Sequence, residues 1–363
     1  VDLANNGTTT INTGTAGGTV SFGGAIEGNT AGAPFNDLLV ITSGTGDVTF
    51  SGAIGATNAL GGLSVNASSG DGNITFSSTI GDTSNPGVVG TTSIGNTDTA
   101  DLNFNAATYS FDGGTTTITA ASGDTIDMGA LADTSFTTAA DNITFATGTI
   151  ELLNGSNLTV DTGATGGDIT IASIAGTSLE TVTLDAGTGA LSVGAIGSGT
   201  EIGAVTLGST DDGTVTLNGA IKTDGNVTIT GPVSLATGAI SVTTTNDNIT
   251  FNDTINGTQA LTLVAGTGTT TIQGEIGGSS ALASLTITNG TANGAIEIAN
   301  IGGVTGATAI GNTNTGTITL DGTAYSTAGT QTYTAAAGQN IDITGAATFT
   351  TTNDNVSFAT SGV

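Results

Sequence analysis

The residues of this chain that could carry out chemistry are almost all acids. The sequence contains 29 Asp and Glu, a single cationic side chain, Lys222, and neither His nor Cys. It therefore lacks the usual general bases and nucleophiles, and the ligand sets of zinc fingers and iron–sulfur clusters. What remains is a set of carboxylates, which can bind hard cations or act in pairs as acid and base.

The charge balance and the short apolar stretches each exclude one class of partner. The formal net charge is -28 at pH 7, whereas nucleic-acid binding depends on Lys and Arg that displace counter-ions from phosphates. We therefore expect no binding to nucleic acid. No stretch of the sequence approaches the roughly 18 consecutive apolar residues of a membrane helix, so we also expect no membrane insertion.

Short acidic turns offer the oxygen ligands that calcium prefers. The candidate residues for a weak calcium site are Asp71, Asn73, Asp211, Asp212, Asn246 and Asp247. These turns match neither the EF-hand calcium loop nor the Gly-Gly-x-Gly-x-Asp repeat, so diffuse binding of counter-ions by the acidic surface is the competing interpretation. No other cofactor is expected.

A pair of carboxylates could instead hydrolyse a glycosidic bond. Asp124 with Asp127, or Asp211 with Asp212, could form such a pair. These acids lie in Gly-rich turns, and the chain has no Trp on which a sugar could stack. We therefore predict no catalytic residue and no enzymatic activity, and we interpret these acids as parts of solvated turns.

The elements that carry these acids are short strands that repeat along the chain. A phrase of the form Gly-x-apolar-x-apolar, followed by Ile, recurs at 18–26, 46–54 and 72–80, and a second phrase, Leu-x-x-Leu-x-Val, occurs at 60–65. Apolar and small polar residues alternate with a period of two, which predicts short strands with one face inward. Gly, Asn and Asp between the phrases suit tight corners.

Equivalent apolar residues recur at intervals in the twenties. The spacing is 28 from Phe22 to Phe50, 26 from Phe50 to Phe76, and 22 from Ile171 to Val193, and such a period is typical of a solenoid. Strand phrases of unequal length favour stacked coils over a meander of hairpins in a sandwich or barrel. We predict an all-β, right-handed parallel β-helix (β-solenoid) with coils of about 22–28 residues. Stacked coils could place six Phe residues in an internal aromatic column, although we favour the interpretation that they are ordinary core residues; they are Phe22, Phe50, Phe76, Phe145, Phe251 and Phe358.

A longer repeat is also present. Ser-Ile-Gly-Asn-Thr-Asp-Thr at 93–99 returns as Ala-Ile-Gly-Asn-Thr-Asn-Thr at 309–315, and Tyr109 returns as Tyr325, both at an offset of 216. We predict a super-repeat of about 215–229 residues within one continuous solenoid. The predicted extents are 1–363 for the solenoid, about 22–250 for the first copy and 251–363 for the second, incomplete copy.

Several phrases resemble the β-strand repeats of very large bacterial surface proteins. They are Asp-Asn-Ile-Thr-Phe at 247–251, Leu-Thr-Leu-Val-Ala-Gly-Thr-Gly at 261–268, Leu-Ala-Ser-Leu-Thr-Ile at 282–287 and Thr-Gln-Thr-Tyr-Thr at 330–334. The family is that of the filamentous-haemagglutinin-like exoproteins and the passenger segments of autotransporter adhesins. The resemblance implies secretion across an outer membrane, a parallel β-helix stalk, and a role in attachment, biofilm or cell-surface structure. The family's secretion domain and C-terminal barrel have no counterpart in these 363 residues, which leaves the export route open.

These features lead to one expected function and two alternatives. We expect a non-enzymatic structural segment of an extracellular bacterial surface protein, a rigid rod or a fibre-forming subunit. Its expected partners are copies of itself, joined end to end or laterally, or the remainder of a longer array. The alternatives are an adhesin whose solenoid surface binds glycans or cells, and a β-helix enzyme that degrades polysaccharides, which would need two convergent acids in a groove.

Overall fold

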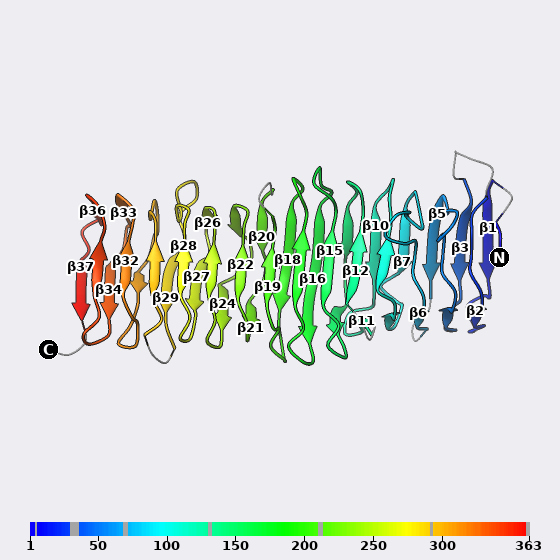
Figure 1. The fold of residues 1–363 in the computed structure, drawn as a ribbon, viewed down its shortest axis with the longest axis horizontal. Helices are drawn as coiled ribbons and strands as arrows, with labels where there is room; N and C mark the ends of the chain where they lie inside the picture. Colours follow the sequence, from blue (N-terminus) through cyan, green and yellow to red (C-terminus); the bar gives the residue numbers. More distant parts are fainter. Residues whose placement is uncertain are drawn as a thin grey trace. The chain divides into compact units, whose positions relative to one another are not determined.

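The chain folds into short parallel strands that stack in ladders. A computed structural model describes residues 1–3, 6–29, 36–67, 72–129, 133–209, 213–290 and 293–360. Within these ranges the strands run side by side (Figure 1), and there is no helix that could cross a membrane. The chain divides into two compact units, Val1–Leu191 and Ser192–Val363, and each unit is built from three ladders.

In the first unit the ladders are named A, B and C in the order in which the chain visits them. Ladder A contains β1 (Thr8–Asn12), β3 (Leu38–Thr42), β5 (Gly62–Asn66), β7 (Thr92–Gly95), β10 (Thr116–Thr119), β13 (Ile143–Phe145) and the first half of β16 (Ile169–Gly176). Ladder B contains β2 (Val20–Phe22), β4 (Val48–Phe50), β6 (Ile74–Phe76), β8 (Leu102–Phe104), β11 (Thr125–Met128), β14 (Thr149–Leu152) and the second half of β16. Ladder C begins with bridges between Ile26, Ile54 and Ile80 and continues through β9 (Thr108–Ser110), β12 (Thr134–Thr137), β15 (Leu158–Asp161) and β17 (Val182–Asp185).

The second unit also consists of three ladders, which are named A, B and C within that unit and independently of the letters used for the first. Ladder A contains β21 (Ile221–Thr223), β24 (Ile240–Thr244), β27 (Ala260–Val264), β29 (Ser284–Thr288), β31 (Thr308–Ile310), β34 (Gln331–Ala335) and β37 (Val356–Thr360), and β18 (Leu191–Ile196) joins it where Ile196 lies opposite Ile221. Ladder B contains β19 (Val205–Leu207), β22 (Val227–Ile229), β25 (Ile249–Phe251), β28 (Thr270–Ile272), β30 (Ile296–Ile298), β32 (Ile318–Leu320) and β35 (Ile341–Ile343). Ladder C contains β20 (Val215–Leu217), β23 (Val233–Leu235), β26 (Ile255–Gly257), bridges through Ile276 and Ile301, β33 (Ala324–Ser326) and β36 (Thr348–Thr350).

This arrangement confirms the predicted all-β parallel β-solenoid. One passage through A, B and C makes one coil, and each strand alternates inward and outward side chains, as Val48, Thr49 and Phe50 do in β4. Inward Ile, Val, Leu and Phe therefore form the core while Thr, Ser and Asn face solvent. Right-handed coiling stays a prediction, which rests on the strong preference of parallel crossover connections for that hand.

A column of stacked Phe rings is present in ladder B of the first unit, and it holds three of the six Phe residues considered from the sequence, whereas Phe145, Phe251 and Phe358 lie on β13, β25 and β37. Phe22, Phe50 and Phe76 stack on one another, and Phe104 extends the column. The ring centroids are 5.4, 4.9 and 5.2 Å apart, and the ring planes deviate by 1°, 7° and 8°. A slip of one residue in any of these strands would turn its Phe outward, so the column helps to fix the register.

Residues related by the 216-residue offset occupy matching positions in ladder C of their own units. Tyr109 and Tyr325 each take the place that an Ile holds one coil earlier. Each hydroxyl accepts a backbone N–H from three residues earlier, from Ala106 at 2.9 Å and from Gly322 at 2.8 Å. The extent of the super-repeat and the continuity of a single solenoid stay predictions.

Candidate functional site

Acidic and amide side chains at the corners bond one coil to the next. Asp47, Asn73 and Asp101 each stand immediately before a ladder B strand of the first unit. The N–H of Asn73 donates to Asp47 Oδ1 at 3.0 Å, and the N–H of Asp101 donates to Asn73 Oδ1 at 3.1 Å. The N–H of Thr125 continues the series by donating to Asp101 Oδ1 at 3.0 Å. These bonds satisfy corner N–H groups that would otherwise depend on solvent.

Two further corner series have the same form. Asn142 Oδ1 accepts the N–H of Asp168, and Asp168 Oδ1 accepts an N–H of the following coil, both at 2.8 Å. In the second unit, Asn226 and Asn248 accept in the same way at 2.9 and 2.8 Å. This role was not predicted from the sequence, although a signal was available. The residue between the Gly and the first apolar position of the strand phrase is often Asp or Asn.

The first group of residues predicted to bind calcium is only partly described by the structure. Asp71, Asp211 and Asp212 lie outside the described residues. The side-chain oxygen of Asn73 is engaged by the backbone of the next coil, as set out above. In the part of the chain that the structure describes, no three Asp or Glu side chains gather as a metal site.

The second calcium candidate is the turn that follows β24. Asn246 and Asp247 are neighbours there, and Asn246 Oδ1 accepts the hydroxyl of Thr267 from the next coil at 3.2 Å. One side-chain oxygen of the turn is therefore already bonded within the protein. Weak calcium binding stays a prediction.

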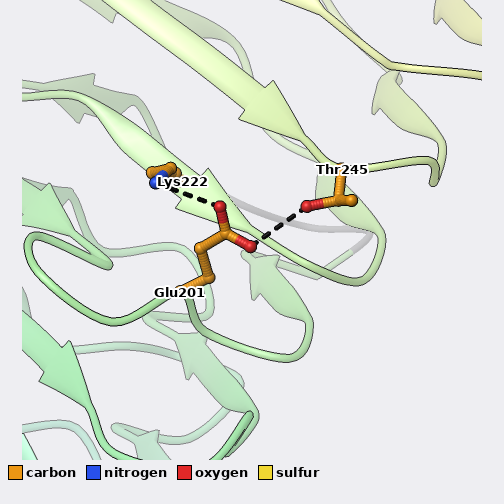
Figure 2. Close-up of polar contacts among 3 residues, drawn as sticks. All are labelled: Glu201, Lys222 and Thr245. Atoms are coloured by element: carbon orange, nitrogen blue, oxygen red, sulfur yellow. Dashed lines mark hydrogen bonds and ion pairs between the residues drawn. The ribbon is translucent and has the colours of Figure 1, made fainter. Parts of the chain in front are cut away.

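The single cationic side chain of the sequence forms an ion pair in the second unit. Lys222 Nζ lies 3.0 Å from Glu201 Oε1, and the Thr245 hydroxyl donates to Glu201 Oε2 at 3.0 Å (Figure 2). The hydrogen bond from Lys222, followed by that from Thr245, lowers the pKa of Glu201. Because the three residues belong to successive coils, the group ties neighbouring coils together at the surface.

The acid pair that was considered for catalysis is divided between a turn and a strand. Asp124 lies in the turn before β11, whereas Asp127 lies on β11, opposite Asn103 on one side and Glu151 on the other. Burial raises the pKa of Asp127, and the charges of Asp101 and Glu151 raise it further. Its Oδ1 is buried without a hydrogen-bond donor. The carboxylate in register with Asp127 is therefore that of Glu151, from a strand one coil away.

A groove in the second unit brings two acids together on the outer surface of ladder B. It has a volume of about 300 Å³, and its polar side chains are those of Thr271, Gln273, Glu297 and Asp321. Glu297 projects from β30, while Gln273 and Asp321 directly follow β28 and β32. These residues were not singled out from the sequence, because each belongs to a different coil and they lie 24 positions apart.

The corner before β17 combines a buried acid with a strained residue. Glu180 is 1% exposed, and both of its carboxylate oxygens accept the N–H of Ser178 at 2.9 Å. Burial opposes its ionisation, but these bonds and those from the hydroxyls of Thr177 and Ser178 outweigh burial and lower the pKa of Glu180 to about 2. Leu179 has a φ of +64°, so the acid holds a tight turn in a conformation that L-residues disfavour.

No protein-family model, no curated protein and no solved structure matches this chain. Its classification therefore rests on its own fold, and the resemblance to haemagglutinin-like and adhesin repeats stays a prediction. This chain is a β-solenoid repeat protein.

Proposed function

We propose that this chain is a non-enzymatic structural segment of an extracellular bacterial surface protein. It serves as a rigid rod or a fibre-forming unit in a cell-surface, matrix or attachment structure, and it associates with copies of itself or with the remainder of a longer array. Its acidic, cation-poor surface favours solvation over recognition of nucleic acid or anionic membranes.

The observation that carries this proposal is the continuity of bonding along each unit. Every coil is joined to the next by three parallel ladders, and the corner side chains of residues such as Asp47 and Asn73 add further bonds between coils. A coil can therefore open only if many bonds break together, which makes a stack of coils stiff along its axis. Stiffness of this kind suits a spacer or a fibre.

The first experiment tests the location of the protein. Antibodies raised against the purified chain are applied to intact and to permeabilised cells of the source bacterium, with a cytoplasmic protein labelled in parallel as the control. The proposal expects labelling of intact cells at the same intensity as that of permeabilised cells. Labelling that requires permeabilisation contradicts an extracellular role.

The second experiment tests the rod and the predicted role of calcium. The purified chain is imaged by electron microscopy with and without a calcium chelator. Elongated particles or fibres of uniform width support the structural role, and their loss on chelation would show that calcium joins or stiffens them. Compact particles of irregular outline would contradict the proposal.

The groove of Gln273, Glu297 and Asp321 favours a second candidate, the glycan-binding adhesin. Carboxylate and amide groups in a groove of about 300 Å³ can accept hydrogen bonds from sugar hydroxyls. Binding of the chain to immobilised glycans should be lost in the double variant Glu297→Gln and Asp321→Asn. The control, Asp342→Asn, changes an exposed acid on the neighbouring strand β35, and it should bind as the wild type does.

The same groove allows a direct test of the enzyme alternative. Two carboxylates in one groove are the minimum that glycoside hydrolysis requires. Incubation of the chain with neutral polysaccharides, followed by measurement of new reducing ends, should show no release above that of the double variant. Release that depends on Glu297 and Asp321 would overturn the non-enzymatic assignment.

A further inference from the structure

A polar recess lies beside ladder C of the first unit. It has a volume of about 170 Å³, and three successive coils contribute to its walls. The exposed and half-buried polar side chains of its lining are those of Thr83, Ser84, Asn85, Ser110, Asp112 and Thr137. The aromatic residue of the lining, Phe111, is only 1% exposed, so the surface that a ligand could touch is mainly polar.

One wall of the recess is an insertion that the corresponding coil of the second unit lacks. Ile-Gly-Asp-Thr-Ser-Asn-Pro-Gly-Val at 80–88 corresponds to Ile-Gly-Gly-Val at 301–304. The two segments hold the same place in the coil, because Ile80 bridges to Tyr109 as Ile301 bridges to Tyr325. The extra residues are 82–86. In repeat proteins, insertions of this kind form loops on one face, which is often the binding face.

The insertion is held in a defined conformation. Asp82 Oδ1 accepts the N–H of Ser84 at 2.6 Å and the N–H of Asn85 at 2.8 Å. The backbone of Ser110 bonds to both ends of the insertion, since its N–H donates to the carbonyl of Ile80 and its carbonyl accepts the N–H of Gly87, both at 2.8 Å. A wall that is formed before the ligand arrives lowers the entropic cost of binding.

The neck of the insertion requires two glycines. Gly81 has a φ of +67°, and a Cβ added to Gly81 or to Gly87 would clash with the backbone nitrogen of the other. The two ends of the loop therefore lie in close contact. This closure keeps the insertion over the recess.

The polar side chains contributed by the two later coils are available to a ligand. Within the described residues, the Asp112 carboxylate and the hydroxyls of Ser110 and Thr137 have no hydrogen-bond partner in the protein. Ser110 on β9 lies opposite Thr137 on β12, so these hydroxyls come from adjacent coils in register. The N–H of Gly113, next to Asp112, donates to Asp141 instead, at 2.6 Å.

The second unit contains a counterpart of this recess without its acid. Ser110 and Asp112 correspond to Ser326 and Ala328 at the offset of 216, and both residues of the second unit line a recess of about 250 Å³. The N–H of Ala328 donates to the carbonyl of Val304 as that of Asp112 donates to the carbonyl of Val88. The backbone arrangement therefore needs neither the acid nor the insertion, which leaves both free to serve a ligand.

The lining selects a small ligand that carries hydroxyls and a positive charge. Asp112 is the one charged residue of the lining, so it disfavours anions and pairs best with a cationic hydrogen-bond donor. The Ser and Thr hydroxyls can both donate to and accept from the hydroxyls of a ligand. A volume of about 170 Å³ is below the roughly 300–1,000 Å³ of pockets for drug-sized ligands, which suits a single sugar residue.

We propose that this recess binds one hexosamine residue with a free amine. The ammonium group of the sugar pairs with the carboxylate of Asp112, and the sugar hydroxyls bond to Ser110, Thr137 and the insertion residues Thr83 and Ser84. The charge-assisted bond makes the protein prefer the amine over a hydroxyl or an acetylated amine at the same position. This inference goes beyond the structural role, because it gives the rod a site for an amino-sugar polymer, and the site is separate from the groove of Glu297.

The test measures binding of methyl glucosaminide to the full chain by isothermal titration calorimetry. The titration is made at about pH 6, where the amine is protonated, and at about 0.15 M salt, which screens diffuse attraction to the acidic surface beyond about 8 Å. Methyl glucoside and methyl N-acetylglucosaminide are the neutral comparison sugars. We expect one glucosaminide to bind per chain, with an affinity about tenfold or more above that of either neutral sugar.

Two variants make the recess resemble its counterpart in the second unit. Asp112→Asn removes the charge, and deletion of residues 82–86 joins Gly81 to Gly87 and reproduces the Ile-Gly-Gly-Val of 301–304. Each should lower the affinity for methyl glucosaminide about tenfold or more. The control Asp98→Asn changes an exposed acid outside the recess and should bind as the wild type does. Circular dichroism verifies folding, and Asp112→Asn decides alone if the deletion variant does not fold.

Three results would overturn the proposal. They are a wild type that binds no glucosaminide, equal affinity for the charged and neutral sugars, and equal loss of affinity in Asp112→Asn and Asp98→Asn. The last result would mean that the sugar is held only by the general negative charge of the surface. Surface labelling and electron microscopy do not depend on this recess, so its failure can be told from failure of the structural function.

Discussion

Glu180 binds both donors of Thr177 in a single corner. The N–H of Thr177 donates to Oε2 and its hydroxyl donates to Oε1, each at 2.9 Å. The Thr177 hydroxyl also lies 2.9 Å from the carbonyl of Leu152, so its single hydrogen is shared between that carbonyl and Glu180 Oε1. The N–H of Gly155 donates to Glu180 Oε1 at 3.3 Å. One buried carboxylate therefore organises its own turn and fastens it to the coil before.

This carboxylate should make the stability of the protein depend on pH. The pKa of Glu180 is about 2 in the folded chain, below its ordinary value of 4.5, so its ionised form favours folding. That contribution, about 3 kcal/mol, is complete above about pH 4.5 and is lost as the pH falls towards 2. Glu180→Gln should lower the free energy of unfolding by a similar amount at pH 7 and by much less at pH 2.

Urea denaturation at both pH values measures this effect. Glu297→Gln is the matched control, because Glu297 is exposed, and it should change the free energy of unfolding by less than about 0.5 kcal/mol. An equal loss for Glu180→Gln at pH 7 and at pH 2 would show that the carboxylate charge does not stabilise the corner.

Asp127 should have the opposite effect on stability. Burial and the neighbouring charges raise its pKa, so its ionised form is costlier in the folded state than in the unfolded state. Ionised Asp127 thus destabilises the protein at neutral pH, and the penalty disappears as the pH falls through its raised pKa. Asp127→Asn should raise the thermal midpoint at pH 7, whereas the exposed control Asp98→Asn should leave it unchanged. A lower midpoint for Asp127→Asn would contradict this account.

Leu179 should be replaceable by Gly with a gain in stability. Its φ of +64° costs an L-residue about 1–2 kcal/mol, and because the side chain is 49% exposed its truncation loses little packing. Part of the relief is offset by the greater chain entropy of Gly in the unfolded state, so Leu179→Gly should stabilise by about 0.5–1 kcal/mol. Leu179→Ala retains the strain and should not stabilise. Chemical denaturation measures the free energy of unfolding of the two variants. Equal changes for Leu179→Gly and Leu179→Ala would show that strain is not released at this position.

Lys222 makes trypsin a reporter of local opening in one strand. It is the only Lys or Arg in the sequence, and it lies within β21 opposite Thr243 of β24. Cleavage requires this strand to leave its ladder, so the folded chain should resist trypsin and the unfolded chain should yield fragments 1–222 and 223–363. Gel electrophoresis follows the reaction. Rapid cleavage under native conditions would show that β21 opens readily.

The ion pair of Lys222 should protect that strand only slightly. Its side chains are 52% and 30% exposed, and pairs of this kind contribute at most about 1 kcal/mol. Glu201→Gln should therefore accelerate trypsin cleavage of the folded chain by no more than about fivefold. A much larger acceleration would mean that the group of Glu201, Lys222 and Thr245 holds the coils together more strongly than its exposure indicates.

The coil architecture could be predicted because its signal is local. Alternation of apolar and polar residues sets which side chains point inward within each strand, and the spacing of phrases such as those at Phe22, Phe50 and Phe76 sets the coil length. In a parallel ladder, equivalent residues of successive coils lie opposite one another, so similar side chains stack. The same logic would have identified the corner positions of Asp47 and Asn73, which recur at the same place in each phrase.

Which side chains from different coils become neighbours could not be predicted from local sequence patterns. From the sequence, Asp127 was considered as a catalytic partner of Asp124, which lies close to it in the chain. In the structure, the acid opposite Asp127 in the strand register is Glu151 from the next coil. The groove of Glu297 and Asp321 likewise draws on separate coils. The predicted coil length of about 22–28 residues is too narrow, because paired residues lie as few as 18 positions apart, from Val215 to Val233, and as many as 30 apart, from Thr8 to Leu38. The partner of an outward residue therefore depends on how many residues each intervening loop takes up.

The sequence by itself therefore determined the β-solenoid and its inward rows of apolar residues, because alternation and period are properties of the chain alone. Only the tertiary structure decided which acids lie side by side, and that Glu180 is buried and fully hydrogen-bonded. The physical reason is that register between coils is set by backbone hydrogen bonds across loops of unequal length, and these bonds exist only once the coils have stacked.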